Sequence, residues 1–265
     1  MSKLYDTLVL VFTVLLLTLP GYAQDSIWSL GAGDNDYSDF ALAPDQHTDY
    51  LSQDFGWPDR CYVIGQSDPQ QDWAYVLPGP RDDWAGSGGL AGIRTQTAEI
   101  LFDLATRPDG DYTLILDLVD VHPNRPPFFR VRINDQRHDF QLEDGASEQT
   151  LLGQPKSGRE VILKVPASEV KEGVNHVALS ILEGSWLLFD QIRLEGPAGV
   201  IIAAPKSTFI RSVTAATSEI SVGGTQAQPL LVDLHQLSGQ SKLTVLLDDQ
   251  TILQRLTTPG RNILE

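Results

Sequence analysis

The chain has 265 residues, of which 42% are hydrophobic, and it carries a formal net charge of −16. This length allows one large domain or two small ones. The acidic balance argues against nucleic acid as a partner, because few basic side chains are free to neutralise phosphates, and against a polybasic contact with a membrane.

The N-terminus has the pattern of a secretory signal peptide. Lys3 lies in a short polar start, an apolar run extends from Leu8 to Leu19, and Ala23 is a small residue suited to cleavage. A membrane anchor is the alternative, but the run is shorter than the roughly 20 residues that span a bilayer. We therefore expect residues 1–23 to be removed, a mature chain without a membrane span, and a secreted or periplasmic protein.

The cysteine and the histidines form no recognisable catalytic or metal-binding motif. Cys61 is the single cysteine, so no disulfide can form within the chain. It precedes Tyr62 and Val63 in a strand-like run, which predicts a buried, unreactive thiol. The five histidines are scattered without metal-ligand spacing.

Beyond residue 24, short apolar runs alternate with Gly, Pro, Asp and Asn, as in chains of short β-strands. In "FFRVRI", Phe129, Val131 and Ile133 alternate with Arg130 and Arg132, which is the period of a half-buried strand. The predicted strands are residues 99–104, 113–121, 128–133, 137–142, 160–166, 175–181 and 185–196. This series predicts an all-β fold, an antiparallel β-sandwich of the jelly-roll type.

"GPAG", at residues 196–199, predicts a domain boundary, because all five tryptophans and all seven tyrosines precede it. Residues 228–237 and 242–256 still read as strands, the latter turning at Asp248-Asp249-Gln250. They are similar to the first strands of an immunoglobulin-like sandwich, which needs about seven. We predict a jelly roll over residues 24–198 and a partial immunoglobulin-like segment, truncated here, over residues 199–265; a small, complete β-appendage is the alternative.

Three stretches resemble a known family. They are "SIWSLGAGDNDYSDF", "CYVIGQSDPQQDWAYVLPGPRDDWAG" and "VPASEVKEGVNHVALSILEGSWLLFDQIRLEGP". Together they resemble, from Ile27 to Pro197, the third domain of family 4 polysaccharide lyases, the rhamnogalacturonan lyases. The resemblance implies a galactose-binding-like jelly roll that performs no chemistry itself. Similar modules lie at the N-terminus of large secreted bacterial glycosidases, including α-mannosidase-like proteins of family 38.

The loop "DWAYVLPGPRDDWAG", from Asp72 to Gly86, is the predicted carbohydrate-binding site. Indole rings stack on the C–H faces of sugars, and nearby Arg and Asp side chains form paired hydrogen bonds with hydroxyl groups. We expect Trp73 to anchor the loop inward, whereas for Trp84 an inward anchor and an exposed stacking residue are both open. The candidate binding residues are Tyr75, Arg81, Asp82, Asp83 and Trp84.

Calcium is the candidate metal. Asp34, Asp36 and Asp39 lie close together in "GAGDNDYSD", and Ca²⁺ prefers carboxylate and carbonyl oxygens. A solvated acidic turn is the alternative. Asp190 lies in the apolar strand "WLLFDQI", where a charge needs hydrogen bonds, so we expect it to accept them from the backbone of a neighbouring loop.

No catalytic residue is predicted. Asp82 and Asp83 are adjacent, but no acid/base partner accompanies them. The favoured hypothesis is a monomeric, non-catalytic module that binds a polysaccharide or glycan, at the N-terminus of a secreted polysaccharide lyase or glycoside hydrolase. The alternatives are a small lyase or esterase in its own right, and a structural spacer without ligand.

Overall fold

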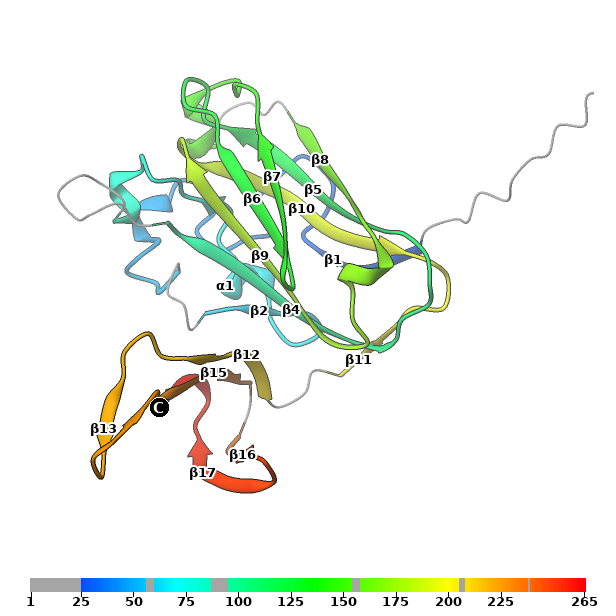
Figure 1. The fold of residues 1–265 in the computed structure, drawn as a ribbon. Helices are drawn as coiled ribbons and strands as arrows, with labels where there is room; N and C mark the ends of the chain where they lie inside the picture. The colour runs from blue at the N-terminus through cyan, green and yellow to red at the C-terminus, as the bar shows by residue number, and fades with distance from the viewer. Residues whose placement is uncertain (1–24, 56–59, 87–94, 154–157, 205–207, 238) are drawn as a thin grey trace, which may run out of the picture.

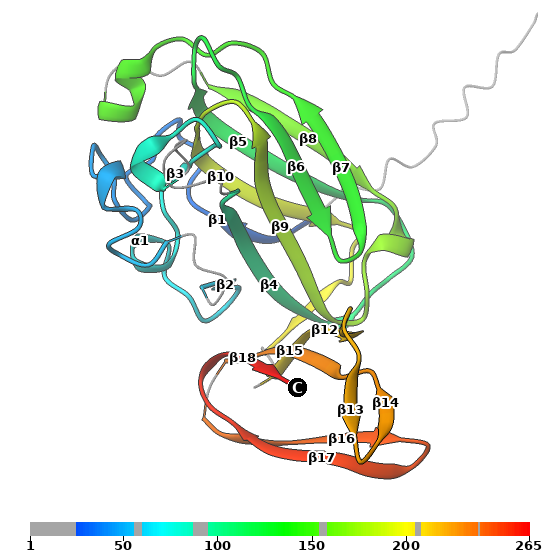
Figure 2. The same ribbon diagram turned by 60° about the vertical axis from the view of Figure 1, so that its left-hand side comes forward.

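The computed structural model describes residues 25–55, 60–86, 95–153, 158–204, 208–237 and 239–265 (Figure 1). The predicted signal peptide lies outside the described residues. Residues 25–204 form two facing β-sheets, called the module below. Residues 208–265 form smaller sheets, called the tail, which lies at one end of the module in both views (Figures 1 and 2).

Two sheets of mainly antiparallel strands make up the module. The first has the order β1-β10-β5-β8, with β3 paired to β10; its strands are Asp25–Leu30 (β1), Leu187–Gly196 (β10), Tyr112–Val121 (β5), Arg159–Val165 (β8) and Val76–Leu77 (β3). The second has the order β11-β4-β9-β6-β7, with β2 parallel to β4; its strands are Ile201–Ala203 (β11), Thr97–Thr106 (β4), Gly173–Glu183 (β9), Phe128–Ile133 (β6), Gln136–Gln141 (β7) and Tyr62–Val63 (β2).

Helical segments in the module are short. They are α1 (Pro69–Asp72) and the 3-10 turns η1 (His47–Asp49), η2 (Asp83–Ala85), η3 (Glu148–Leu152) and η4 (Ala167–Glu169). None of the helices in the described part of the chain is both long and apolar enough to cross a membrane.

The core lies between the two sheets. On β6, Phe129, Val131 and Ile133 are at most 2% exposed, so the predicted alternation is confirmed. Central strand β5 is buried along nearly its whole length because β10 and β8 flank it and the second sheet covers it. The predicted strands of the first domain are all present, and the chain has the expected jelly-roll sandwich.

The tail contains more strands than the sequence predicted. Its sheets are β12-β15-β18, β13-β14 and β16-β17, and the strands are Thr208–Ala215 (β12), Ile220–Val222 (β13), Thr225–Ala227 (β14), Leu230–Gln236 (β15), Ser241–Leu247 (β16), Gln250–Thr257 (β17) and Gly260–Leu264 (β18). The turn from β16 to β17 is where predicted, and Asp248 and Asp249 adopt the positive φ angles of 48° and 63° that a tight hairpin requires.

Two features join the tail to the module. β11 pairs with β4, so the module's sheet continues past the expected boundary at residue 198. Phe209, at the start of β12, is 9% exposed and packs with Val63 and Leu101 on the outer face of β4. Beside it, Arg211 forms an ion pair with Glu99, with 2.5 Å between Nη1 and Oε2.

Candidate functional site

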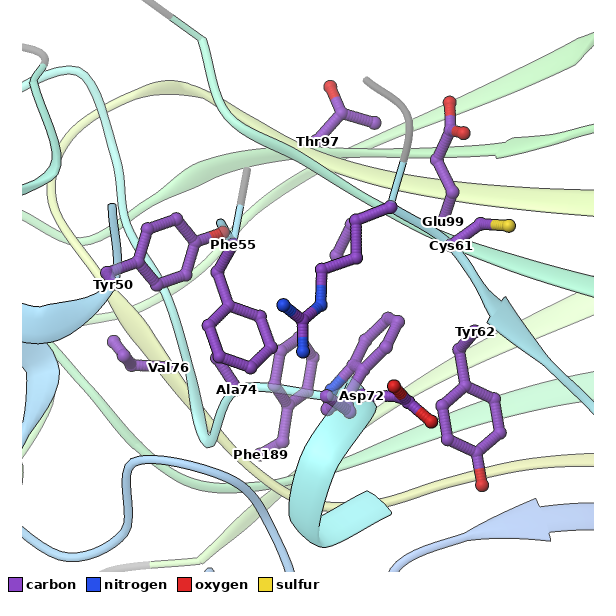
Figure 3. Close-up of a pocket in the computed structure, with 13 residues that line it drawn as sticks. Tyr50, Phe55, Cys61, Tyr62, Asp72, Ala74, Val76, Thr97, Glu99 and Phe189 are labelled. Carbon is purple, nitrogen blue, oxygen red and sulfur yellow. The ribbon is translucent and has the colours of Figure 1, made fainter. Parts of the chain in front are cut away.

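A pocket of about 350 Å³ opens on the side of the module that carries α1 (Figure 3). Its walls come from four places in the chain: the segment that leads into β2, the stretch from the end of α1 to β3, the start of β4 and the start of β10. Figure 3 shows Phe55 and Phe189 in the middle of the pocket, with Tyr50 on one side and Tyr62 and Asp72 on the other.

Aromatic rings form the pocket floor. Trp73 is 3% exposed; its ring centroid lies 5.3 Å from that of Phe189 and 6.1 Å from that of Tyr62. The Trp73 Nε1 atom is buried and has no hydrogen-bond partner in the described part of the chain. Trp73 therefore anchors the loop inward, as expected, and it also leaves an unused donor at the pocket.

Arg60 lines the pocket over the Phe55 ring. Its guanidinium stands 3.9 Å from the centre of the Phe55 ring, in a cation–π contact. Its Nη1 donates to the Gln53 carbonyl at 2.6 Å, and its Nη2 donates to the Gln71 carbonyl. A ligand entering the pocket would therefore meet a fixed cation before it reached the Phe55 ring.

Carboxylates complete the polar part of the pocket. Asp72 is half-buried, and its Oδ2 accepts from the backbone N–H of Asp68 at 2.8 Å. Glu99 is 6% exposed. Burial alone would raise the pKa of Glu99, but His176 and Arg211 outweigh it and hold this pKa at about 2. Glu99 is therefore ionised at neutral pH and engaged by the tail.

Two of the predicted sugar-binding residues lie in the interior, below the loop surface. Tyr75 is 0% exposed, and its hydroxyl donates to the Leu151 carbonyl at 2.8 Å. Asp82 is 5% exposed and accepts from Gly79 N at 2.7 Å and from Ser185 Oγ at 2.5 Å. Burial raises the pKa of Asp82 to about 6 despite these donors. Both side chains hold the loop in shape from beneath, and they add to its backbone hydrogen bonds, such as the one from Arg81 N to the Gly184 carbonyl at 3.2 Å.

The other three predicted residues reach the surface. Arg81 and Asp83 are exposed, and Trp84 is half-buried. The Trp84 ring meets His47 at 5.0 Å and Tyr50 at 6.1 Å between centroids, both nearly perpendicular. Since Tyr50 also lines the pocket, it connects the Trp84 loop to the aromatic floor.

The acidic loop that follows β1, from Gly31 to Asp39, is held by hydrogen bonds from its backbone N–H groups to carboxylates. Asp190 Oδ1 accepts from the backbone N–H groups of Asp34 and Asp36 at 3.2 and 3.3 Å, which confirms the role predicted for Asp190. Burial nevertheless raises the pKa of Asp190.

The carboxylates of the predicted calcium site also face backbone amides. Asp34 Oδ1 accepts from Asp36 N at 3.0 Å, and Asp39 Oδ2 accepts from Ala32 N at 2.8 Å. Within the described residues, no three His, Cys, Asp or Glu side chains are grouped so that they could hold a metal ion. These hydrogen bonds account for the shape of the loop without an ion, and calcium there stays a prediction.

The sequence did not single out Tyr50, Phe55 or Arg60. They precede β2 in a segment with no strand pattern, and only the fold brings them against Phe189, which lies in β10. The sequence feature that could have indicated them is the group of aromatic residues at positions 50, 55 and 57, which precede the loop from Asp72 to Gly86.

Comparison with known protein families identifies the module. Residues 26–194 match the family model described as CBM-like, polysaccharide lyase family 4, domain III. The chain belongs to this family. The match spans the two facing sheets and the pocket, and it establishes a module of the carbohydrate-binding type.

Solved structures give weaker likenesses. A family 35 carbohydrate-binding module from an environmental isolate is 18% identical, with a TM-score of 0.30 over 42% of this chain and 72% of that one. The family GH115 4-O-methyl-alpha-glucuronidase BtGH115A is 11% identical, with a TM-score of 0.32 over 64% of this chain and 17% of that one. The ANXUR2 extracellular domain from Arabidopsis thaliana is 14% identical, with a TM-score of 0.27 over 68% and 41%. Such low TM-scores carry no argument about ligands. No curated protein matches the chain.

Proposed function

We propose that this protein is a non-catalytic accessory module that binds the glycan substrate of a secreted polysaccharide lyase or glycoside hydrolase. The observation that supports this most is the coincidence of the family match with an aromatic pocket on the same module. Secretion rests on the signal-peptide pattern of residues 1–23, and the parent enzyme rests on the family in which such modules occur.

The pocket and the Trp84 loop suit a sugar for physical reasons. Ligand pockets combine apolar walls with a few polar groups, and this pocket does so through its aromatic rings, Arg60 and Asp72. Half-buried Trp84 offers an indole face, while Arg81 and Asp83 beside it are free to meet hydroxyl groups. The unused Trp73 Nε1 donor adds a place where a hydroxyl oxygen would relieve a buried, unpaired group.

Binding through this site also explains why Asp82 and Tyr75 are buried. A preformed loop loses little conformational entropy when a ligand binds. The hydrogen bonds from Ser185 Oγ and Gly79 N to Asp82 fix the loop before any ligand arrives. Gly79 contributes too, since a Cβ there would come within 2.6 Å of the Gly184 carbonyl oxygen.

Glycan-array binding of the full chain, followed by calorimetry on the best neutral oligosaccharide, tests this proposal. Trp84→Ala should weaken binding about tenfold or more, as expected for loss of a stacking aromatic, and Trp84→Phe should restore most of it. Binding that is indifferent to both changes would assign the loop a scaffold role. Growth of absorbance near 235 nm with pectic polysaccharide would show lyase activity and overturn the non-catalytic assignment.

A further inference from the structure

A second hollow lies on another part of the surface, between the β6–β7 hairpin and β12 of the tail. It is open to solvent, and the charged residues that line it are Arg132, Arg137, Lys171, Arg211, Asp135 and Glu172, together with His176 and Phe209. Figure 2 shows the turn between β6 and β7 pointing toward the tail. We call this hollow the basic groove.

Basic side chains outnumber acidic ones in the basic groove. Lys171 pairs with Asp135 across 3.5 Å, and Arg211 is held by Glu99. In contrast, the side chains of Arg132 and Arg137 have no hydrogen bond or ion pair with the residues that the structure describes, although Arg137 is attracted at longer range by Asp139. Two guanidinium groups without a bonded carboxylate among these residues therefore line the groove of a protein whose net charge is −16.

Strand register places these two arginines side by side. Arg132 of β6 is directly opposite Arg137 of β7, two register positions further along than Arg130 and Asp139 and on the same face of the sheet. Like charges directly opposite each other on a sheet are destabilising. Asp139 attracts Arg137 only at longer range, because both of its oxygens accept hydrogen bonds from Arg130, each at 2.7 Å.

The surroundings of Arg132 leave room for a partner. On its other side, β9 presents Ala178, whose side chain is small. The Nε atom of Arg132 is buried and lacks a hydrogen-bond partner in the described part of the chain. Phe209 and Val174 add apolar surface to the same groove.

We propose that the basic groove is a second binding site, for an anionic glycan whose carboxylate or sulfate groups pair with Arg132 and Arg137. A planar guanidinium recognises such oxyanions through two parallel hydrogen bonds. An anion between the two arginines would replace a repulsive pair by two attractive ones. The site is separate from the aromatic pocket and does not depend on the function proposed for it.

Matched polymers test the charge requirement in the full chain. Polygalacturonate and its methyl ester differ in free carboxylates, and dextran sulfate and dextran differ in sulfates. We expect at least one charged polymer to bind and its uncharged counterpart to bind at least tenfold more weakly, with affinity falling as salt rises. Equal binding of a charged polymer and its uncharged counterpart, or no binding of either charged polymer at low salt, would overturn the proposal. Binding of neutral glycans is measured separately. It tests the aromatic pocket, so the proposed function and the basic groove can fail independently.

Matched arginine variants locate the site. Arg132→Gln should weaken binding of the charged polymer about tenfold, the size expected when one charge-assisted pair of hydrogen bonds is lost. Arg130→Gln, on the same strand and face but already paired with Asp139, should change that affinity less than twofold. Arg132→Gln should also leave the melting temperature unchanged or raise it, because it removes like-charge repulsion. Equal effects of the two variants on binding would place the anion elsewhere and refute the assignment.

Discussion

The module and the tail are both built almost entirely of strands, yet they bury their apolar side chains very differently. In the module, two sheets face each other and enclose a continuous core from Trp28 to Leu194. In the tail, the strands form three small sheets. Most of the exposed large hydrophobic side chains lie in the shorter tail: Ile210, Val213, Ile220, Leu246, Leu247, Ile252, Leu256 and Ile263. Strand content alone does not make a core; a facing layer does.

The buried part of the tail relies on polar contacts. Gln236 and Thr257 are each 1% exposed, and Gln236 Oε1 accepts from Thr257 Oγ1 at 2.9 Å and from Thr208 Oγ1 at 2.7 Å. Its main apolar anchor, Phe209, packs against the module. The tail is thus stabilised from outside, whereas the module is stabilised from within.

A change in the core of the module should have the largest effect on stability, and it tests whether the module is held together by its own core. Trp73→Ala removes a side chain that is 3% exposed and packed against Phe189. We expect it to lower the free energy of unfolding by about 3–5 kcal/mol, as for other large-to-small core changes. Guanidinium denaturation measures this, and a loss below about 1 kcal/mol would contradict the packing described.

Phe209→Ala attacks the attachment of the tail. It should lower the free energy that holds the tail against the module by about 2–4 kcal/mol, because it removes the ring that packs on Val63 and Leu101. Amide hydrogen exchange should then speed up in β12 and β15, while the module's strands stay protected. Ile210→Ala is the control, since Ile210 is 55% exposed and should leave exchange unchanged. Equal effects of the two changes would mean that Phe209 does not hold the tail.

Asp82 adds a pH dependence to the module that the tail should not share. Burial raises the pKa of Asp82 from 3.8 to about 6 in the folded state. The folded protein then keeps a proton that the unfolded chain has released, so the free energy of unfolding falls as pH rises from about 4 to 6. We expect a fall of about 2–3 kcal/mol from this group, since each pKa unit corresponds to about 1.4 kcal/mol.

Urea denaturation between pH 4 and 7 measures this contribution. Asp82→Asn should flatten the fall, whereas Asp83→Asn, at the neighbouring exposed position, should leave it in place. If the wild type and Asp82→Asn kept a constant difference across this range, Asp82 would not be the titrating group.

Trp84→Ala is the mildest of these changes and sharpens the contrast within the loop itself. Trp84 is half-buried at the edge of the core, and its ring contacts with His47 and Tyr50 are nearly perpendicular. We expect a stability loss of about 1 kcal/mol or less, far below that of Trp73→Ala. A melting temperature as low as that of Trp73→Ala would show that both tryptophans are anchors.

The sequence predicted the module well because its signals are local and repeated. Alternation in β6, the "NDQ" turn and the apolar strand around Asp190 each depend on neighbouring residues. The tail was predicted less completely, since β13 and β14 are three residues each and β18 carries Arg261 and Asn262. Such short, polar strands form through pairing with partners that are distant in sequence.

The candidate site was only half predictable for a related reason. Loop composition indicated that Trp84, Arg81 and Asp83 matter, but composition cannot show which side of a loop faces the core. Ser185 is far from Asp82 in the chain, and it is the contact between them that accounts for the burial of Asp82. Likewise, Phe55 and Arg60 form a pocket only because the fold places Phe189 of β10 against them.

The pairing of β11 with β4 also bears on the edge of the module's second sheet. β2 covers β4 at Ile100 and Leu101, and β11 covers it from Asp103 to Thr106. A strand left with a row of free N–H and C=O groups is a template for other chains. A chain cut after residue 198 loses β11 and bares that row, whereas one cut after residue 204 keeps it covered. We therefore expect a chain cut after residue 198 to aggregate more readily than one cut after residue 204, because only the latter keeps β11 paired with β4.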